Sequence, residues 1–138
     1  MFKQLFKNAF QPKEAKFGFN LNFVSGTLNH NPISKLKAGK CALNFENQIM
    51  YIKQGDEVLT ENVSDIESIR TWTYKRKAFV MHIFTKTHNE YKFSTAFDNE
   101  NMLKMLILES LTRYANAHNI PNEFCGDFSN HGDSEDDE

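Results

Sequence analysis

The fold class is decided by one stretch, FGFNLNF at residues 17–23, in which apolar and small polar residues alternate without a break. Successive side chains of a β-strand point to opposite faces, so this alternation predicts a strand with one buried face. The surrounding chain has 138 residues, of which 40% are hydrophobic and 13 are Phe. A chain of this length forms one domain by default, and its core should be rich in aromatic rings.

Downstream of this strand, short apolar patterns alternate with turn residues such as the tripeptide Gln54-Gly55-Asp56. Each pattern has the length and the period of a strand, and the residues between them are typical of tight turns. The turn-rich stretch at residues 25–32, in contrast, predicts a loop. The patterns together predict seven strands, at residues 17–23, 42–45, 49–53, 58–59, 66–74, 79–85 and 91–96.

One long amphipathic helix follows the strands, from about Asp98 to His118. Asp98 is a good N-cap, and a charged His118 would suit the negative end of the helix dipole. Asn119 is expected to form a left-handed cap, and Pro121 prevents the helix from continuing. The predicted core stripe of this helix consists of Leu103, Leu106, Ile107, Leu111, Tyr114 and Ala117.

Three further apolar residues of the helix, Met102, Met105 and Leu108, fall outside that stripe. A helix that is apolar over so much of its circumference must be covered by a second element. We expect the start of the chain to provide the cover and the protein to be a monomer. The alternative is a dimer in which Met102, Met105 and Leu108 meet a second copy.

Phe2, Phe6 and Phe10 recur at helical spacing at the start of the chain, with Lys3 and Lys7 between them. They predict a short amphipathic helix, which at about ten residues would be marginal alone and is therefore expected to dock on the domain. The alternative is that its phenylalanines and lysines lie in the interface of an anionic membrane, where attachment would be weak and reversible.

The charge is distributed unevenly along the chain, although the net charge is only -2. From Asp127 onward there are six acidic residues and no Lys or Arg, and such a composition predicts disorder. We therefore expect an N-terminal amphipathic segment at residues 1–16, a single domain at 17–125 and a disordered acidic tail at 126–138. The tail either keeps the chain in solution or shields a basic surface of the domain.

A basic turn, Lys75-Arg76-Lys77, lies beside Trp72 and Tyr74. These five residues are candidates for ligand binding, because lysine and arginine can contact phosphates while an aromatic ring stacks on the ligand. The plainer interpretation, and the favoured one, is a solvated hairpin tip whose aromatic residues are cross-strand pairs.

Motifs for catalysis, cofactors or metals are missing from the sequence. It has no Gly-x-Ser-x-Gly, no glycine-rich phosphate loop and no Cys-x-x-Cys, and Cys125 and His131 lie in or near the expected tail. Cys41 and Cys125 are therefore expected to be reduced thiols of a cytoplasmic protein. We expect a protein that is not an enzyme and that carries no cofactor and no metal.

The order of seven strands and one C-terminal helix resembles the pleckstrin-homology-like superfold in its bacterial and GRAM-type versions. The resemblance covers about residues 17–118 and is carried by KAGKCALNF at 37–45, QIMYI at 48–52 and VSDIESI at 63–69. It implies a mainly β (α+β) domain, a seven-stranded antiparallel barrel or sandwich of two bent sheets capped by the helix. It also implies a class of proteins that bind lipid headgroups or peptides and have no catalytic machinery.

The function expected from these features is a non-catalytic binding or adaptor module that engages a protein partner. The contact would use an exposed strand edge or the groove beside the C-terminal helix. One alternative is peripheral binding to anionic lipids at the inner face of the membrane through the basic N-terminus. Another is single-stranded nucleic-acid binding, with the acidic tail as an autoinhibitor; against it, small barrels with that role carry their helix between two strands.

Overall fold

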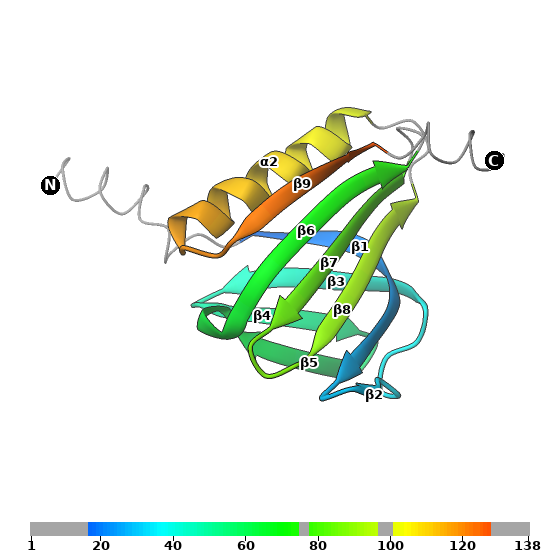
Figure 1. Ribbon diagram of the computed structural model, residues 1–138. Helices are drawn as coiled ribbons and strands as arrows, with labels where there is room; N and C mark the ends of the chain where they lie inside the picture. Colours follow the sequence, from blue (N-terminus) through cyan, green and yellow to red (C-terminus); the bar gives the residue numbers. More distant parts are fainter. Residues whose placement is uncertain (1–16, 75–77, 97–100, 128–138) are drawn as a thin grey trace, which may run out of the picture.

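The computed structural model describes residues 17–74, 78–96 and 101–127, which form strands and one long helix (Figure 1). This composition confirms the predicted mainly-β class with a C-terminal helix, and strands occupy all seven predicted positions. The segment expected to form the N-terminal helix lies outside the described residues. The elements are β1 (Phe17–Leu28), β2 (Asn31–Pro32), β3 (Gly39–Glu46), β4 (Ile49–Gln54), β5 (Glu57–Asn62), the 3₁₀ turn η2 (Val63–Asp65), β6 (Ile66–Tyr74), β7 (Ala78–Thr85), β8 (Glu90–Ala96), α2 (Asn101–Ala117) and β9 (Asn122–Asp127).

All of these strands join one nine-stranded sheet in the order β5-β4-β3-β1-β8-β7-β6-β9, with β2 attached to β1. The sheet folds back on itself into a rear layer, β3 to β5, and a front layer, β6 to β8, and β1 passes from one to the other (Figure 1). The sheet has two strands more than predicted, β2 and β9. It is also mixed rather than wholly antiparallel, because β6 and β9 run parallel.

Strand β1 is longer than its sequence pattern indicates. The loop expected at residues 25–32 is wrong, because β1 extends to Leu28 and β2 follows after a tight turn. The pairing of β1 with β8 shifts register at Val24, which forms a bulge. A bulge bends a strand and increases its twist, and this one lies where β1 leaves β3 and joins β8.

Gly26 explains why the sequence was misread at this point. A Cβ atom on Gly26 would lie 2.5 Å from the carbonyl oxygen of Glu90 and 2.8 Å from Cδ1 of Ile33. Any side chain here would push β1 away from β8, so the glycine permits a close approach of two backbones. Among the neighbouring residues of the sequence alone, however, Gly26 is typical of a turn, and this led to the predicted loop.

One cluster of buried apolar side chains joins the two layers. Leu21 and Phe23 of β1 are 4% and 3% exposed, as the alternation at residues 17–23 predicts. Phe23 meets Phe93 of β8 edge to face at 5.9 Å between ring centroids, which agrees with the aromatic-rich core expected. The largest fully buried side chains are Tyr91, Phe45, Phe79, Phe93, Leu43, Met50, Ile52, Ile69, Met81, Ile83 and Leu111.

The core-facing side of helix α2 agrees with the predicted stripe at Leu111 and Tyr114 and differs from it at Ala117. Leu111 and Ala115 are buried and Leu108 packs against the core, whereas Ala117 is exposed. Leu108, Leu111 and Ala115 are three and four positions apart and share one face, from which Ala117 is turned away. Leu108 therefore contacts its own core while staying partly exposed, and the dimer contact considered above stays a prediction. The side chains of Met102 and Met105 lie outside the described part.

The predicted left-handed cap of the helix is confirmed at Asn119, whose φ is 60°. The amide of Ile120 donates to the carbonyl of Ala115 at 2.8 Å, and that of Asn119 donates to the carbonyl of Asn116 at 3.2 Å. These two bonds form a Schellman motif, and its buried Ile120 supplies the usual hydrophobic contact. The motif ends the helix and directs the chain into β9.

Strand β9 extends past the domain boundary expected at residue 125. Gly126 and Asp127, which were placed in the disordered tail, are part of the strand. The hydroxyl of Thr73 on β6 donates to the carboxylate of Asp127 at 2.7 Å and fastens this end of the strand. Residues 128–138 lie outside the described part. No helix among the described residues is long and apolar enough to cross a membrane.

The two cysteines are expected to react at very different rates. Cys41 is buried, and burial raises the pKa of its thiol to about 11, so roughly one molecule in a thousand carries the thiolate at pH 8. Cys125 on β9 is exposed. A disulfide reagent at pH 8 should modify one thiol rapidly in the native protein and a second only in denaturant. Rapid reaction of a Cys125→Ser variant would contradict the buried position of Cys41.

Candidate functional site

The outer face of the front layer gathers polar and aromatic side chains from three neighbouring strands. Ile69 and Thr71 of β6 point into the core, so the alternating residues Arg70 and Trp72 point outward. The register places Arg70 opposite His82 on β7, and His82 opposite Lys92 on β8. A row of cationic or titratable side chains therefore crosses the layer.

The His82 ring contacts two other rings on this face, those of Trp72 and Phe84, and we call these three residues the aromatic cluster. The ring centroids of Trp72 and His82 are 6.4 Å apart, and those of His82 and Phe84 are 4.3 Å apart. The guanidinium of Arg70 lies 6.0 Å from the centroid of Phe84, within the range of a cation–π contact. All three rings are half-buried, so the cluster offers apolar surface to a partner.

His82 has an environment that disfavours its charged form. Partial burial lowers the pKa of its imidazole, and the positive charge of Lys92 lowers it further. The carboxylate of Glu90, whose Oε1 lies 3.6 Å from Nε2 of His82, opposes this shift without reversing it. A neutral imidazole has one donor and one acceptor nitrogen, so at neutral pH His82 suits a polar contact better than an ion pair.

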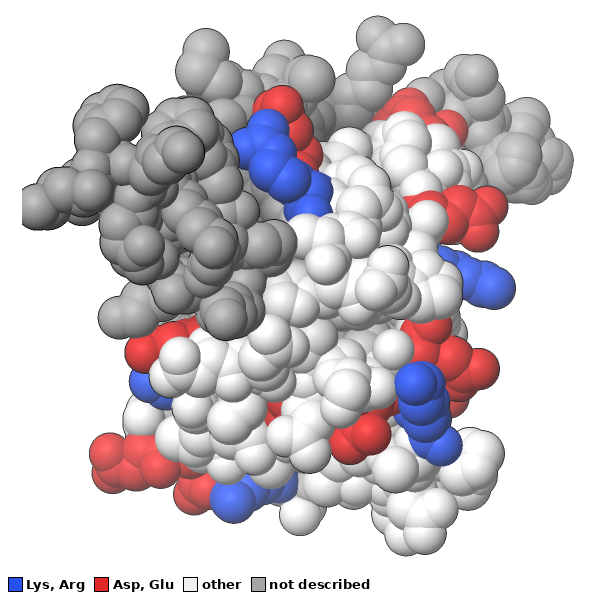
Figure 2. Space-filling model, turned by 90° about the vertical axis from the view of Figure 1, so that its left-hand side faces the viewer, with Lys and Arg blue, Asp and Glu red and all other residues white. Residues whose placement is uncertain are grey.

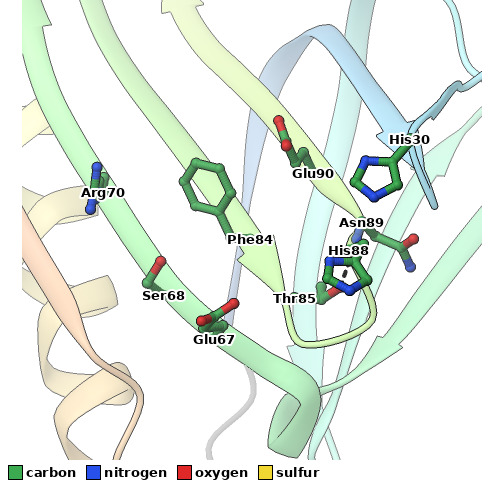
Figure 3. A pocket seen from close by; sticks show the side chains of 9 residues that line it. All are labelled: His30, Glu67, Ser68, Arg70, Phe84, Thr85, His88, Asn89 and Glu90. Carbon is green, nitrogen blue, oxygen red and sulfur yellow. Dashed lines mark hydrogen bonds between the residues drawn. The ribbon is translucent and has the colours of Figure 1, made fainter.

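Two hollows flank the aromatic cluster. In the larger, of about 350 Å³, Phe84 lies between Arg70 on one side and the imidazoles of His30 and His88 on the other, with Glu67 below it in Figure 3. The two imidazoles stack at 5.2 Å between centroids. The smaller hollow, of about 330 Å³, shares Glu90 with the first and is lined by Ser25, Gly26, Thr27, Pro32, His82, Glu90 and Lys92. Both are of a size that accommodates side chains of a partner.

A buried hydrogen-bond network holds one wall of the larger hollow, and we call Glu61, Asn89 and Tyr91 the Glu61 network. The carboxylate of Glu61, which is 8% exposed, accepts from the amide of Asn89 at 2.8 Å and from the hydroxyl of Tyr91. Asn89 also accepts from the backbone amide of Asn29 at 2.9 Å. Burial raises the pKa of Tyr91, and its bond to Glu61 raises it further. The network ties β5 of the rear layer to β8 of the front layer.

The structure brings one of the predicted site residues into this face. Trp72 lies in the aromatic cluster, and Tyr74 ends β6 with its side chain outside the described part. The basic turn Lys75-Arg76-Lys77 and the N-terminal residues Phe2, Lys3, Phe6, Lys7 and Phe10 lie outside the described residues.

The partners of Trp72 were missed by the sequence analysis. Alternation along β6 could have placed Arg70 and Trp72 on one face, but bringing in His82 and Phe84 requires the register between β6 and β7. His82, which is half-buried, was not among the predicted site residues.

In the part of the chain that the structure describes, no group of three or more His, Cys, Asp and Glu residues could hold a metal ion.

Figure 2 shows another side of the molecule, on which charges of both signs are interspersed around a largely uncharged middle. Polyanions are attracted by continuous basic surfaces, and the described residues on that side form none. The arrangement on the front layer is suited to recognition by shape, aromatic contact and a few polar groups.

Comparison with known proteins gives a likeness of fold. No protein-family model and no curated protein matches the chain. A chain in the structure of the Spt16D–Pob3N heterodimer is similar, with a TM-score of 0.51 and 18% sequence identity. The match covers 81% of this chain and 55% of that one, so this chain spans little more than half of the other's length. At this identity the likeness concerns the fold alone, a mainly-β sheet domain.

Proposed function

We propose that this protein is a non-catalytic binding module of pleckstrin-homology-like fold that engages a protein partner through the outer face of its front layer. The observation that carries the proposal is the aromatic cluster with Arg70 beside it. Tryptophan and arginine are enriched among the residues that dominate the free energy of protein association. Here they stand next to hollows that could receive side chains of the partner.

The arrangement of charges supports a protein partner over a uniformly charged one. Arg70 and Lys92 lie on the same face as Glu67 and Glu90, so neither sign dominates around the cluster. A protein interface typically has an aromatic centre and a rim with both signs of charge. An anionic lipid surface or a nucleic acid would gain little from this pattern, and both alternatives depend on basic residues outside the described part.

Two observations support the proposed pleckstrin-homology-like fold. The sheet bends at β1 into two layers, and a C-terminal helix packs on their common core. The similar chain in the Spt16D–Pob3N structure has a related arrangement over 81% of this chain. Modules of the pleckstrin-homology-like kind bind ligands and have no catalytic groups, in agreement with the sequence analysis.

The test is capture of partners from native lysate by the tagged full-length chain, with reversible cross-linking. Trp72→Ala and Arg70→Ala should each reduce recovery of the captured protein about tenfold or more, the effect expected from the centre of an interface. Binding of the identified partner should weaken by the same factor in a titration with purified components.

The rear layer provides matched control variants. Lys53 lies over the ring of Tyr51 at 5.4 Å, a second cation–aromatic pair on an outer face. Tyr51→Ala and Lys53→Ala should leave capture unchanged. Equal recovery with all four variants, or recovery of nothing above background with the unaltered chain, would contradict the proposal. Binding of oligonucleotides or of anionic vesicles that Trp72→Ala abolishes would instead favour one of the alternatives.

A further inference from the structure

Strand β5 ends the sheet, and its hydrogen-bonding groups have a definite orientation. Gln54 faces Glu57 across a two-residue turn at one end, and the amide of Val63 donates to the carbonyl of Gln48 at 2.9 Å at the other. Bonded and non-bonded pairs alternate along an antiparallel ladder. The pairs Gln54–Glu57 and Gln48–Val63 at the two ends are both bonded, so every second pair between them is bonded as well. Glu57, Leu59 and Glu61 therefore bond to β4. The N–H and C=O groups of Val58, Thr60 and Asn62 therefore point away from the sheet.

A side-chain contact supports this orientation. The ammonium of Lys35 lies 3.5 Å from the carbonyl oxygen of Val58, as expected for a carbonyl group that is not bonded to β4. Lys35 also lies 3.9 Å from the carboxylate of Glu57, and both of these side chains are about half exposed. Such a contact is readily displaced, because exposed ion pairs contribute little free energy.

Edge strands usually carry features that prevent pairing with another chain, such as proline, bulges or charged residues. Strand β9 at the opposite edge has a register shift against β6, and its Gly126, with a φ of 103°, further interrupts the regular strand geometry. Strand β5, with the sequence EVLTEN, carries the charged residues Glu57 and Glu61, of which Glu61 is already bonded to Asn89 and Tyr91. It has no proline, glycine or register shift, and it pairs regularly with β4 over its whole length. Figure 1 shows it as the lower border of the rear layer.

The sequence of β5 is compatible with pairing to itself. If Thr60 lies opposite Thr60 of a second copy, Val58 lies opposite Asn62 of that copy, and all outward backbone groups of these residues meet partners. The same register places Glu57 opposite Val63 and Glu61 opposite Leu59 of the second copy, so no carboxylate faces another. Threonine opposite threonine is a favourable cross-strand pair. Val58, which is 40% exposed, would become covered.

We propose that two copies of this chain associate through their β5 edges, antiparallel about a twofold axis at Thr60, so that the rear layers form one continuous sheet. The symmetric arrangement is an isologous interface, which closes at two copies and cannot propagate into a fibre. This surface is separate from the aromatic cluster, so the dimer would present two binding faces. The proposal does not depend on the proposed function.

A charge-exchange experiment tests both the surface and its symmetry. The mass of the full-length chain is measured by sedimentation between about 1 μM and 1 mM, a range that covers ordinary dimer affinities. Thr60→Lys and Thr60→Glu each place like charges directly opposite one another, so each variant alone should dimerise at least about tenfold more weakly. An equimolar mixture of the two variants should recover the dimer, because opposite charges then meet.

Two sets of control variants separate this effect from misfolding and from a general effect of charge. Asn20→Lys and Asn20→Glu add the same charges at an exposed position on β1, away from the edge, and should leave dimerisation unchanged. Thr60→Pro removes the outward N–H without breaking the ladder with β4, and it should abolish the dimer while Thr60→Val retains it. Thermal unfolding establishes that each variant is folded.

Four results would overturn the proposal. The first is an unaltered chain that stays monomeric up to 1 mM, and the second is a mixture of charge variants that dimerises no better than each alone. The third is a dimer that persists in both charge variants, which would place the interface elsewhere. A monomeric chain that accepts a strand from a different protein at β5 would also exclude a second copy as the occupant.

Discussion

The Phe45→Ala variant is expected to lose about 4 kcal/mol of unfolding free energy, the usual cost of removing a fully buried aromatic ring. Phe45 on β3 is 0% exposed, and its ring centroid lies 4.9 Å from that of Tyr114 on α2. The ring thus fills the space where the rear layer meets the helix. Its removal leaves a cavity at that contact, and equilibrium denaturation followed by circular dichroism measures the loss.

Phe124→Ala is the matched control for this prediction. The Phe124 side chain on β9 is 49% exposed, so its truncation should cost less than about 1 kcal/mol. Similar losses in the two variants would mean that Phe45 is not part of the core. A Phe45→Leu variant should fall between them, since leucine fills part of the cavity.

The second large effect is expected from Glu61→Ala, which should lower the unfolding free energy by about 3 kcal/mol. The reason lies in the groups that remain: the hydroxyl of Tyr91 and the amide of Asn89 lose a shared acceptor in a buried site. A buried donor without a partner costs far more than the bond contributed while it was made. Glu57→Ala removes an exposed carboxylate from the same strand and should cost less than about 0.5 kcal/mol.

Tyr91→Phe separates the two donors of the Glu61 network. In a double-mutant cycle with Glu61→Ala it should show strong coupling, and additive losses would mean that the hydroxyl does not bond to Glu61.

The raised pKa of Tyr91 also makes the unfolding free energy of the protein depend on pH. Its stabilising contribution is present below the ordinary tyrosine pKa of 10.0 and is lost as the pH rises above that value. Tyr91→Phe should not show this alkaline loss.

Local patterns predicted the parts of the fold that depend on local sequence. The alternation at residues 17–23, the turn at Gly55 and the cap at Asn119 are each determined within a few residues, and each was found where expected. Strand β9 was missed because its pairing is parallel to β6, far away in sequence. The continuation of β1 was missed because Gly26 is required by the approach of β8 and not by its neighbours.

The candidate site was less predictable for a related reason. Trp72 attracted attention through its neighbours in the sequence, but His82 and Phe84 join it only through the register of two strands. Glu61 resembles a solvated residue of a short strand, and nothing near it indicates that a tyrosine from β8 will meet it. A site assembled from several strands cannot be predicted from the alternation along any one of them. The alternation tells which face of the sheet a residue lies on, but not which residues of the neighbouring strands lie beside it.

The passage of β1 between the layers leads us to expect a definite order of folding. Strands β3 to β5, and likewise β6 to β8, are neighbours both in the sequence and in the sheet, and such local antiparallel pairings form early. Pairing of β1 with β8 brings Asn22 to Ser94, so nearly the whole intervening chain must be closed into a loop before that contact contributes. We therefore expect the pairing of β1 with β8 to be the slow step, following the separate pairing of β3 to β5 and of β6 to β8.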